Sequence, residues 1–175
     1  MKLTDIAPLE RWIDFEKDIN LKSGMDCNVF DTKGYRVSTL KNWANRLCPA
    51  IKETDKGQSF ICAPAHMNIA AMAMKQRQPV IEECDAGMLK LVVPIFVRNE
   101  FIGAVSGCGL LLEDGEVDSY LVNMITGIEE AHVDTLTSDL TAISRNQASE
   151  LAGFIQQRVE EIVAAYQDQD RQQKD

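Results

Sequence analysis

The sequence lacks any apolar run long enough to cross a bilayer, and residues 1–6 contain no apolar signal region. It also lacks a basic stripe, because its 18 Lys and Arg residues are scattered among 27 Asp and Glu residues, which gives a net charge of -9 and a pI of about 4.7. Such a surface repels nucleic acid and anionic lipid. We therefore expect a cytoplasmic protein that binds neither nucleic acid nor membranes.

Catalytic groups are also scarce. The chain has only 2 histidines, His66 and His132, and no familiar nucleophile motif, so no complete catalytic set is visible and we do not expect an enzyme. Its 5 cysteines are an odd number without a secretory signal, which argues against a disulfide framework. Reduced thiols and metal ligands remain as interpretations of these cysteines.

What is present is the pattern of one compact globular domain of 175 residues with a sizeable core, since 45% of the residues are hydrophobic. Two apolar strands, joined by a tight turn at 98–100, predict a hairpin within residues 88–112. The remaining patterns predict strands at 26–31, 35–38 and 80–83, and helices at 7–22, 59–77, 116–125, 131–140 and from 144 onward. We predict an α/β (α+β) fold.

Three cysteines and a histidine fall in one segment of the chain. Cys62 and His66 are four residues apart on a predicted helix, so both side chains point the same way. Thiolate and imidazole at that spacing can share a metal ion, and Cys48 and Cys84 flank the helix and complete a set of four ligands. Zinc or an iron–sulfur cluster suits such a set. The alternative is a group of core thiols, because the spacing matches no standard metal motif.

Cys84 also suggests a thiol-dependent enzyme as an alternative. Its neighbour Asp85 works against this hypothesis, because a nearby carboxylate raises the pKa of a thiol. The second histidine, His132, lies far along the chain and beside two acidic residues. A Cys–His catalytic pair is therefore weakly supported.

The last part of the chain, from residue 144, repeats apolar residues at helical spacing, which predicts one long helix with a polar, frayed end over residues 167–175. The mixture of spacings of three and four indicates a helical seam, either with a second copy in a homodimer or with the sheet of its own chain. We divide the chain into a sensory domain at 1–143 and a signalling or dimerisation helix at 144–175. A plain dimeric interaction module is an alternative function.

Several short motifs together resemble the PocR sensory domain over roughly residues 5 to 165. They are Phe60-Ile61-Cys62, Glu83-Cys84-Asp85-Ala86-Gly87, Val93-Pro94-Ile95 and Phe101-Ile102-Gly103, and Cys48 matches a further family cysteine. His66 stands where the family often carries another cysteine. The resemblance implies an antiparallel sheet with flanking helices, similar to PAS and GAF domains, and a pocket for small organic molecules. It also implies a DNA-binding, kinase or cyclase output, either on a separate protein or in a longer chain of which this sequence is a part.

Taken together, the residues and the resemblance predict a sensory domain. Its pocket is expected to hold a small organic ligand, or a metal or iron–sulfur cofactor held by Cys48, Cys62, His66 and Cys84, and to relay its state through the terminal helices. Glycines in the second hairpin strand indicate bulges or a close approach of the backbone to a ligand. The predicted ligand contacts are Cys62, His66, Cys84, Asp85, Gly87, Gly103, Gly107 and Cys108.

Overall fold

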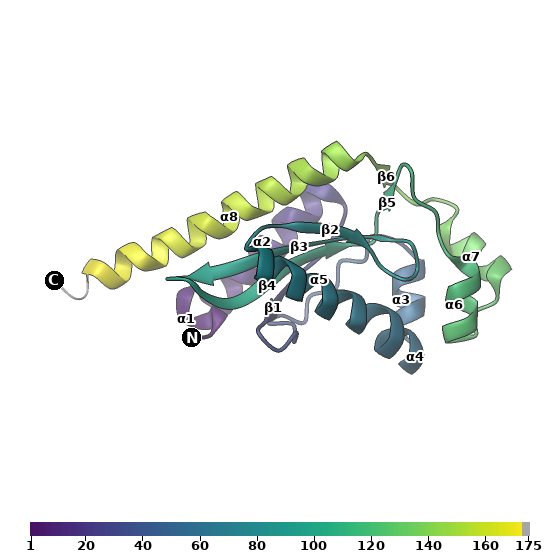
Figure 1. Cartoon of the computed structure of the whole chain (residues 1–175), viewed down its shortest axis with the longest axis horizontal. Helices are drawn as coiled ribbons and strands as arrows, with labels where there is room; N and C mark the ends of the chain where they lie inside the picture. Colours follow the sequence, from purple (N-terminus) through teal and green to yellow (C-terminus); the bar gives the residue numbers. More distant parts are fainter. Residues whose placement is uncertain (173–175) are drawn as a thin grey trace.

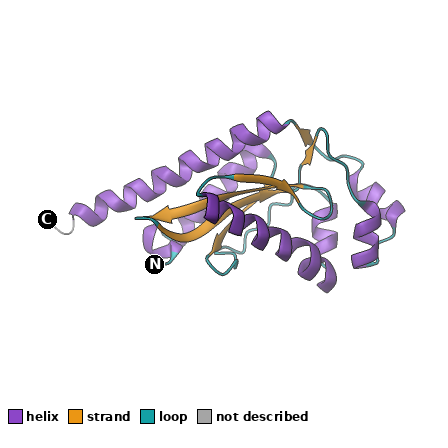
Figure 2. Ribbon diagram, viewed as in Figure 1, coloured by secondary structure: helices purple, strands orange, loops and turns teal. Residues whose placement is uncertain are grey.

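A four-stranded antiparallel sheet forms the centre of the computed structural model, which describes residues 1–172 (Figures 1 and 2). The strand order is β1-β4-β3-β2. Helices α2 and α8 cover one face and helix α5 covers the other, as Figure 1 shows. The strands are β1 (Asp26–Asp31), β2 (Val80–Glu83), β3 (Leu89–Val97) and β4 (Glu100–Cys108). The predicted mixed fold, with its antiparallel sheet, flanking helices and long C-terminal helix, is confirmed.

The hairpin of β3 and β4 is the longest pairing of the sheet. Arg98 and Asn99 connect the two strands with φ angles of 48° and 71°. A two-residue turn with positive φ at both positions matches the right-handed twist of the strands, so the chain reverses without splaying them. The register then aligns Lys90 with Cys108 and Val92 with Ser106, and it shifts once between Ile95 and Phe96.

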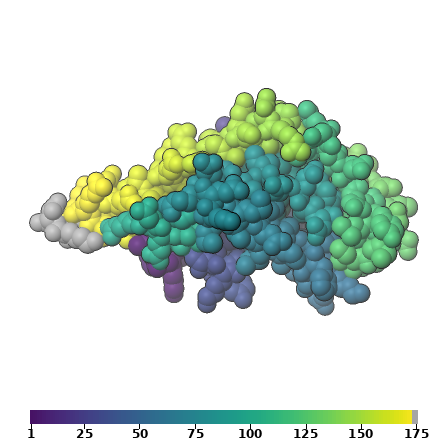
Figure 3. Space-filling view, in the orientation of Figure 1, coloured from purple at the N-terminus to yellow at the C-terminus, as the bar shows by residue number. Residues whose placement is uncertain are grey.

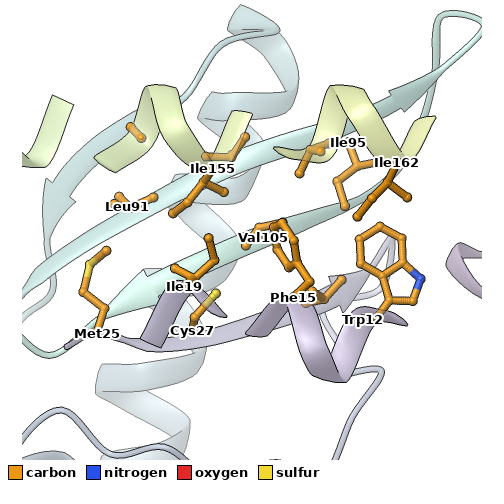
Figure 4. Packing of buried hydrophobic residues seen from close by; sticks show 14 of the residues in the cluster. Trp12, Phe15, Ile19, Met25, Cys27, Leu91, Ile95, Val105, Ile155 and Ile162 are labelled. Carbon is orange, nitrogen blue, oxygen red and sulfur yellow. The ribbon is translucent and has the colours of Figure 1, made fainter. Parts of the chain in front are cut away.

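The main core lies between the sheet and helices α2 (Leu9–Ser23) and α8 (Arg145–Gln172). Alternate residues of the strands point into it, because successive side chains of a strand point to opposite faces. Figure 4 shows this packing for Trp12, Phe15 and Ile19 of α2, Cys27 of β1, Leu91 and Ile95 of β3, Val105 of β4, and Ile155 and Ile162 of α8. The indole Nε1 of Trp12 donates to the carbonyl of Leu3 in α1 (Leu3–Ile6) at 3.1 Å.

Helix α8 is the longest element of the described chain, and it continues to Gln172 through the segment predicted to fray. Residues 173–175 of that prediction lie outside the described residues. Arg98, at the hairpin turn, forms an ion pair with Asp170 of α8, so the hairpin tip and the end of α8 together form the narrow end of the molecule (Figure 3). The functional division at residue 144 stays a prediction.

The opposite face of the sheet carries a smaller core and most of the remaining helices. Helix α5 (Ala63–Gln76) packs on β2, β3 and β4. At one end of the sheet a separate apolar cluster joins α3 (Leu47–Lys52), α6 (Ser119–Thr126) and α7 (Glu130–Thr137). Between α3 and α5 run α4 (Asp55–Gly57) and the π-helical turn η1 (Gln58–Cys62).

Two elements differ from the sequence-based expectation. The predicted strand at 35–38 is wrong, because only one isolated bridge forms there, between Phe30 and Arg36. A parallel pair, β5 (Leu111–Leu112) with β6 (Ala142–Ile143), was not predicted; it joins segments far apart in the sequence, and two-residue strands leave no periodic signal. Among the described residues, no helix combines the length and apolar character that crossing a membrane requires.

Candidate ligand-binding pocket

A cavity of about 680 Å³ opens on the face of the sheet that α5 covers. Side chains from β1, β3 and β4 line it on the sheet side, and α3, η1, α5 and the loop at 33–43 supply its other walls. A second cavity of about 370 Å³ lies between α8, strand β3 and the segment that follows α5. The larger cavity is the candidate site, because it gathers most of the residues singled out from the sequence.

The floor of the cavity is polar, which is unusual for the interior face of a sheet. Strand register places Asp26 of β1 opposite Cys108 of β4, and Cys108 opposite Lys90 of β3, so the three residues form one row across three strands. All three line the cavity, and Asp26 and Lys90 are buried. The sequence neighbours of Asp26 and Lys90 point to the opposite face and fill the main core. The same strands therefore provide both the core and the pocket floor.

The wall formed by η1 and α5 brings together the predicted pair Cys62 and His66. Both side chains line the cavity, as their spacing of four residues on a helix predicts. Cys62 ends the π-helical turn, a local geometry that is frequent at functional sites. The imidazole of His66 stacks on the ring of Phe30, with 3.8 Å between centroids and 28° between planes. Its Nδ1 is buried and has no hydrogen-bond partner among the described residues.

Four of the cysteines, Cys48, Cys62, Cys84 and Cys108, line this cavity, and the fifth, Cys27, is buried in the main core. Burial disfavours a thiolate, so it raises the pKa of Cys48 and Cys84, and it raises the pKa of Cys62 to about 11. These cysteines are therefore thiols at neutral pH, which is unfavourable for a nucleophile.

The four predicted metal ligands are not arranged as a coordination site. Among residues 1–172, no group of three or more His, Cys, Asp or Glu side chains is arranged to hold one metal ion. The predicted ligands Cys48, Cys62, His66 and Cys84 thus share a cavity but, as placed, do not fit a common ion. The metal or iron–sulfur cofactor stays a prediction.

The remaining predicted contacts do not line the cavity. Gly87 has a φ of 82° and closes the turn after Cys84, where a Cβ atom would lie 1.9 Å from the carbonyl oxygen of Glu116. Gly103 and Gly107 let the backbone of β1 and the side chain of Met25, respectively, approach β4 closely. These glycines serve close packing within the chain, and Asp85 is exposed. We leave these four residues, Asp85, Gly87, Gly103 and Gly107, out of the candidate site.

Several lining residues escaped the sequence analysis, chiefly the basic ones. Five basic residues line the cavity, Lys33, Arg36, Lys41, Lys52 and Lys90, together with two acidic ones, Asp26 and Glu53. Arg36 and Asp26 form an ion pair at 3.4 Å. Lys90 left one signal in the sequence, because it is the single charged residue within the apolar strand Leu89–Val97.

The pKa of His66 reflects the burial and the positive charges of the site. Burial, together with the nearby charges of Lys90, Lys52 and Arg36, lowers the pKa of His66 to about 3. The imidazole is therefore neutral at physiological pH, with one nitrogen that donates and one that accepts a hydrogen bond. The other histidine, His132, is exposed on α7 and lies outside the cavity lining, so the structure does not join it to Cys84.

Comparison with known families identifies the chain. Residues 5–166 match the family described as the sensory domain found in PocR, which confirms the resemblance noted from the short motifs. Searches of curated proteins and of solved structures found no match. The family indicates a sensory role rather than a catalytic one.

Proposed function

Because this chain belongs to the PocR family of sensory domains, we propose that the cavity of about 680 Å³ is its sensory pocket and that the ligand is a small organic molecule. The volume falls in the range of pockets for such ligands, which is about 300–1,000 Å³. The lining combines apolar side chains such as Phe30, Trp43 and Met88 with a few converging polar groups. The observation that carries the proposal is the polar row Asp26, Cys108 and Lys90 on the floor of this cavity.

The sheet itself supplies a route from the pocket to the terminal helices. Lys90 points into the pocket, whereas Leu89 and Leu91 on either side point into the core that contains α2 and α8. If the domain has two conformations that differ in where β3 lies, a ligand that binds one conformation more tightly shifts the equilibrium toward it. We propose that this shift moves α8, which contacts β3 and β2, and that a separate output protein or a second copy of the chain reads the position of α8.

A screen that measures binding, followed by a blocking variant, tests the location of the site. Thermal-shift and titration experiments with small diols, amines and organic acids identify a ligand. Ala63→Phe then fills the cavity from α5, and Ala71→Phe is its matched control, because Ala71 lies exposed on the same helix outside the lining. We expect Ala63→Phe to abolish binding and Ala71→Phe to retain it. Unchanged affinity in a folded Ala63→Phe variant contradicts this location.

The cofactor alternative is supported by one observation, that Cys48, Cys62, His66 and Cys84 all line the same cavity. Anaerobic purification followed by elemental analysis and a visible spectrum tests it, with Cys62→Ala as the comparison. Stoichiometric zinc or iron that is lost in the variant would replace the organic-ligand proposal. Metal-free, colourless protein leaves the organic ligand as the occupant.

A further inference from the structure

The charge of the cavity is opposite to the charge of the protein. The chain carries 27 acidic and 18 basic residues, yet the cavity lining has five basic and only two acidic ones. One of these acidic residues, Asp26, is already paired with Arg36, and the other, Glu53, is exposed. An acidic protein that concentrates basic side chains in one concave site raises the local concentration of anions there.

Lys90 is the strongest single feature of this cavity. Its relative exposure is 7%, and it forms no hydrogen bond and no ion pair within 4.0 Å with any residue in the described part of the chain. Its side chain lines the cavity, where an anionic ligand can supply the counter-charge that the described residues do not. Glu82 lies opposite Lys90 in the register of β2 and β3, but its side chain is exposed and does not reach the ammonium group. The cavity is therefore the place from which an ion-pair partner can reach Lys90.

The charges around His66 support the same conclusion. Lys90, Lys52 and Arg36 all act on this imidazole, and no carboxylate acts on it to balance them. Lys52 lies over the ring of Trp43, with its Nζ at 5.1 Å from the ring centroid, and has no ion pair among residues 1–172. The unpartnered Nδ1 of His66 adds a neutral polar group beside the cations. This part of the pocket offers positive charge and one further hydrogen bond.

We infer that the ligand of this pocket is a small organic carboxylate, whose charged group pairs with Lys90 and whose apolar part lies against Phe30 and Met88. This inference rests on the proposed sensory function of the cavity. Lys90 fits a carboxylate as a compact point charge, while the guanidinium of Arg36 is engaged by Asp26. A hydroxyl or keto oxygen on the same ligand matches Nδ1 of His66.

Matched ligands test the charge requirement. Titration calorimetry on the full chain uses carboxylates of two to six carbons, each beside the amide and the alcohol of the same skeleton, and inorganic phosphate as a different anion. We expect the carboxylates to bind about tenfold to a hundredfold more tightly than the amides, as for a hydrogen bond to a charged group. We also expect salt to weaken their binding.

Two variants test whether Lys90 is the residue that binds the carboxylate group. Lys90→Met keeps the length of the side chain and removes the ammonium group, and we expect it to reduce carboxylate affinity to that of the amide and to leave amide binding unchanged. Lys75→Met, on the exposed side of α5, is the control that retains wild-type affinity. If Lys90→Met fails to fold, NMR of the wild type at pH 7 replaces it. The side-chain signals of Lys90 are followed during titration with a carboxylate and with the amide of the same skeleton: a larger shift with the carboxylate is expected, and equal shifts refute the inference.

The outcomes separate this inference from the proposed function. Equal binding of carboxylate, amide and alcohol, blocked by Ala63→Phe, refutes the carboxylate and keeps the sensory pocket. Preference for phosphate over every carboxylate also refutes the carboxylate. Binding that Ala63→Phe does not block refutes the pocket itself. Carboxylate preference that is lost in Lys90→Met supports both.

Discussion

The buried imidazole of His66 should make the protein less stable in mild acid. The perturbation is a change of pH from 7.5 to 5, which protonates histidine in the unfolded chain, where its pKa is about 6.5. In the folded chain the side chain is 6% exposed, and burial together with Lys90, Lys52 and Arg36 lowers its pKa to about 3. The unfolded state therefore binds the proton first, so acidification favours unfolding.

The size of the effect follows from linkage between protonation and folding. The loss begins as pH falls below about 6.5 and grows until the folded imidazole is itself protonated, near pH 3. Integration between the two pKa values gives a loss of about 2 kcal/mol at pH 5 relative to pH 7.5. At pH 5 this figure hardly depends on the folded pKa, because the folded imidazole is still neutral there.

Urea unfolding followed by circular dichroism at pH 7.5, 6.5, 5.5 and 5 measures this contribution. Burial also raises the pKa of Glu16, so this group adds to the pH dependence, and the informative quantity is the difference between the wild type and His66→Gln. We expect the wild type to lose about 2 kcal/mol more than His66→Gln between pH 7.5 and pH 5. His132→Gln, at an exposed site on α7, should retain the wild-type pH dependence. Parallel pH profiles for the wild type and His66→Gln would refute the buried neutral imidazole.

Three further predictions follow from named contacts. Gly87→Ala should reduce the free energy of unfolding by about 3 kcal/mol or more, because its Cβ would lie 1.9 Å from a backbone oxygen. The control Gly127→Ala, at a φ of 78° with nothing within 4 Å, should cost only about 1 kcal/mol of backbone strain. Comparable losses of the two variants in urea unfolding would contradict the close approach at Gly87. Glu16→Ala should cost at least about 2 kcal/mol, since this buried carboxylate accepts hydrogen bonds from a backbone amide and a hydroxyl, and unaltered stability would disprove their importance. The rate at which iodoacetamide alkylates Cys62, measured by mass spectrometry of the peptide that contains it, should rise about tenfold per pH unit from pH 7 to pH 10. The reason is that the pKa of the Cys62 thiol is raised to about 11. A rate that levels off near pH 8 would indicate an ordinary thiol.

Local patterns in the sequence were sufficient for most of the sheet and for one wall of the pocket. The hairpin follows from two apolar strands around a tight turn, and both of its strands and its turn lie where the pattern places them. Cys62 and His66 lie on the same side because helical geometry fixes the direction of residues four apart. These features depend only on residues close together in the chain.

The pocket floor could not be predicted in the same way. The row of Asp26, Cys108 and Lys90 exists only once the register of three strands is known, and no local pattern encodes pairing between β1 and β4, which residues 32–99 separate. The sequence indicates bulges or a close approach of a ligand at the glycines of β4, whereas Gly103 and Gly107 admit other parts of the same chain. A small residue indicates that something approaches closely, but the sequence does not say what.

The alternation of side chains along β3 has a consequence for how such a domain diversifies. Residues that face the pocket, such as Lys90, belong to a different packing unit from Leu89 and Leu91, which hold the sheet to α2 and α8. Substitutions on the pocket side can therefore change what is bound without leaving a void in the main core. A scaffold of this kind lets ligand preference evolve at little cost in stability, one strand position at a time.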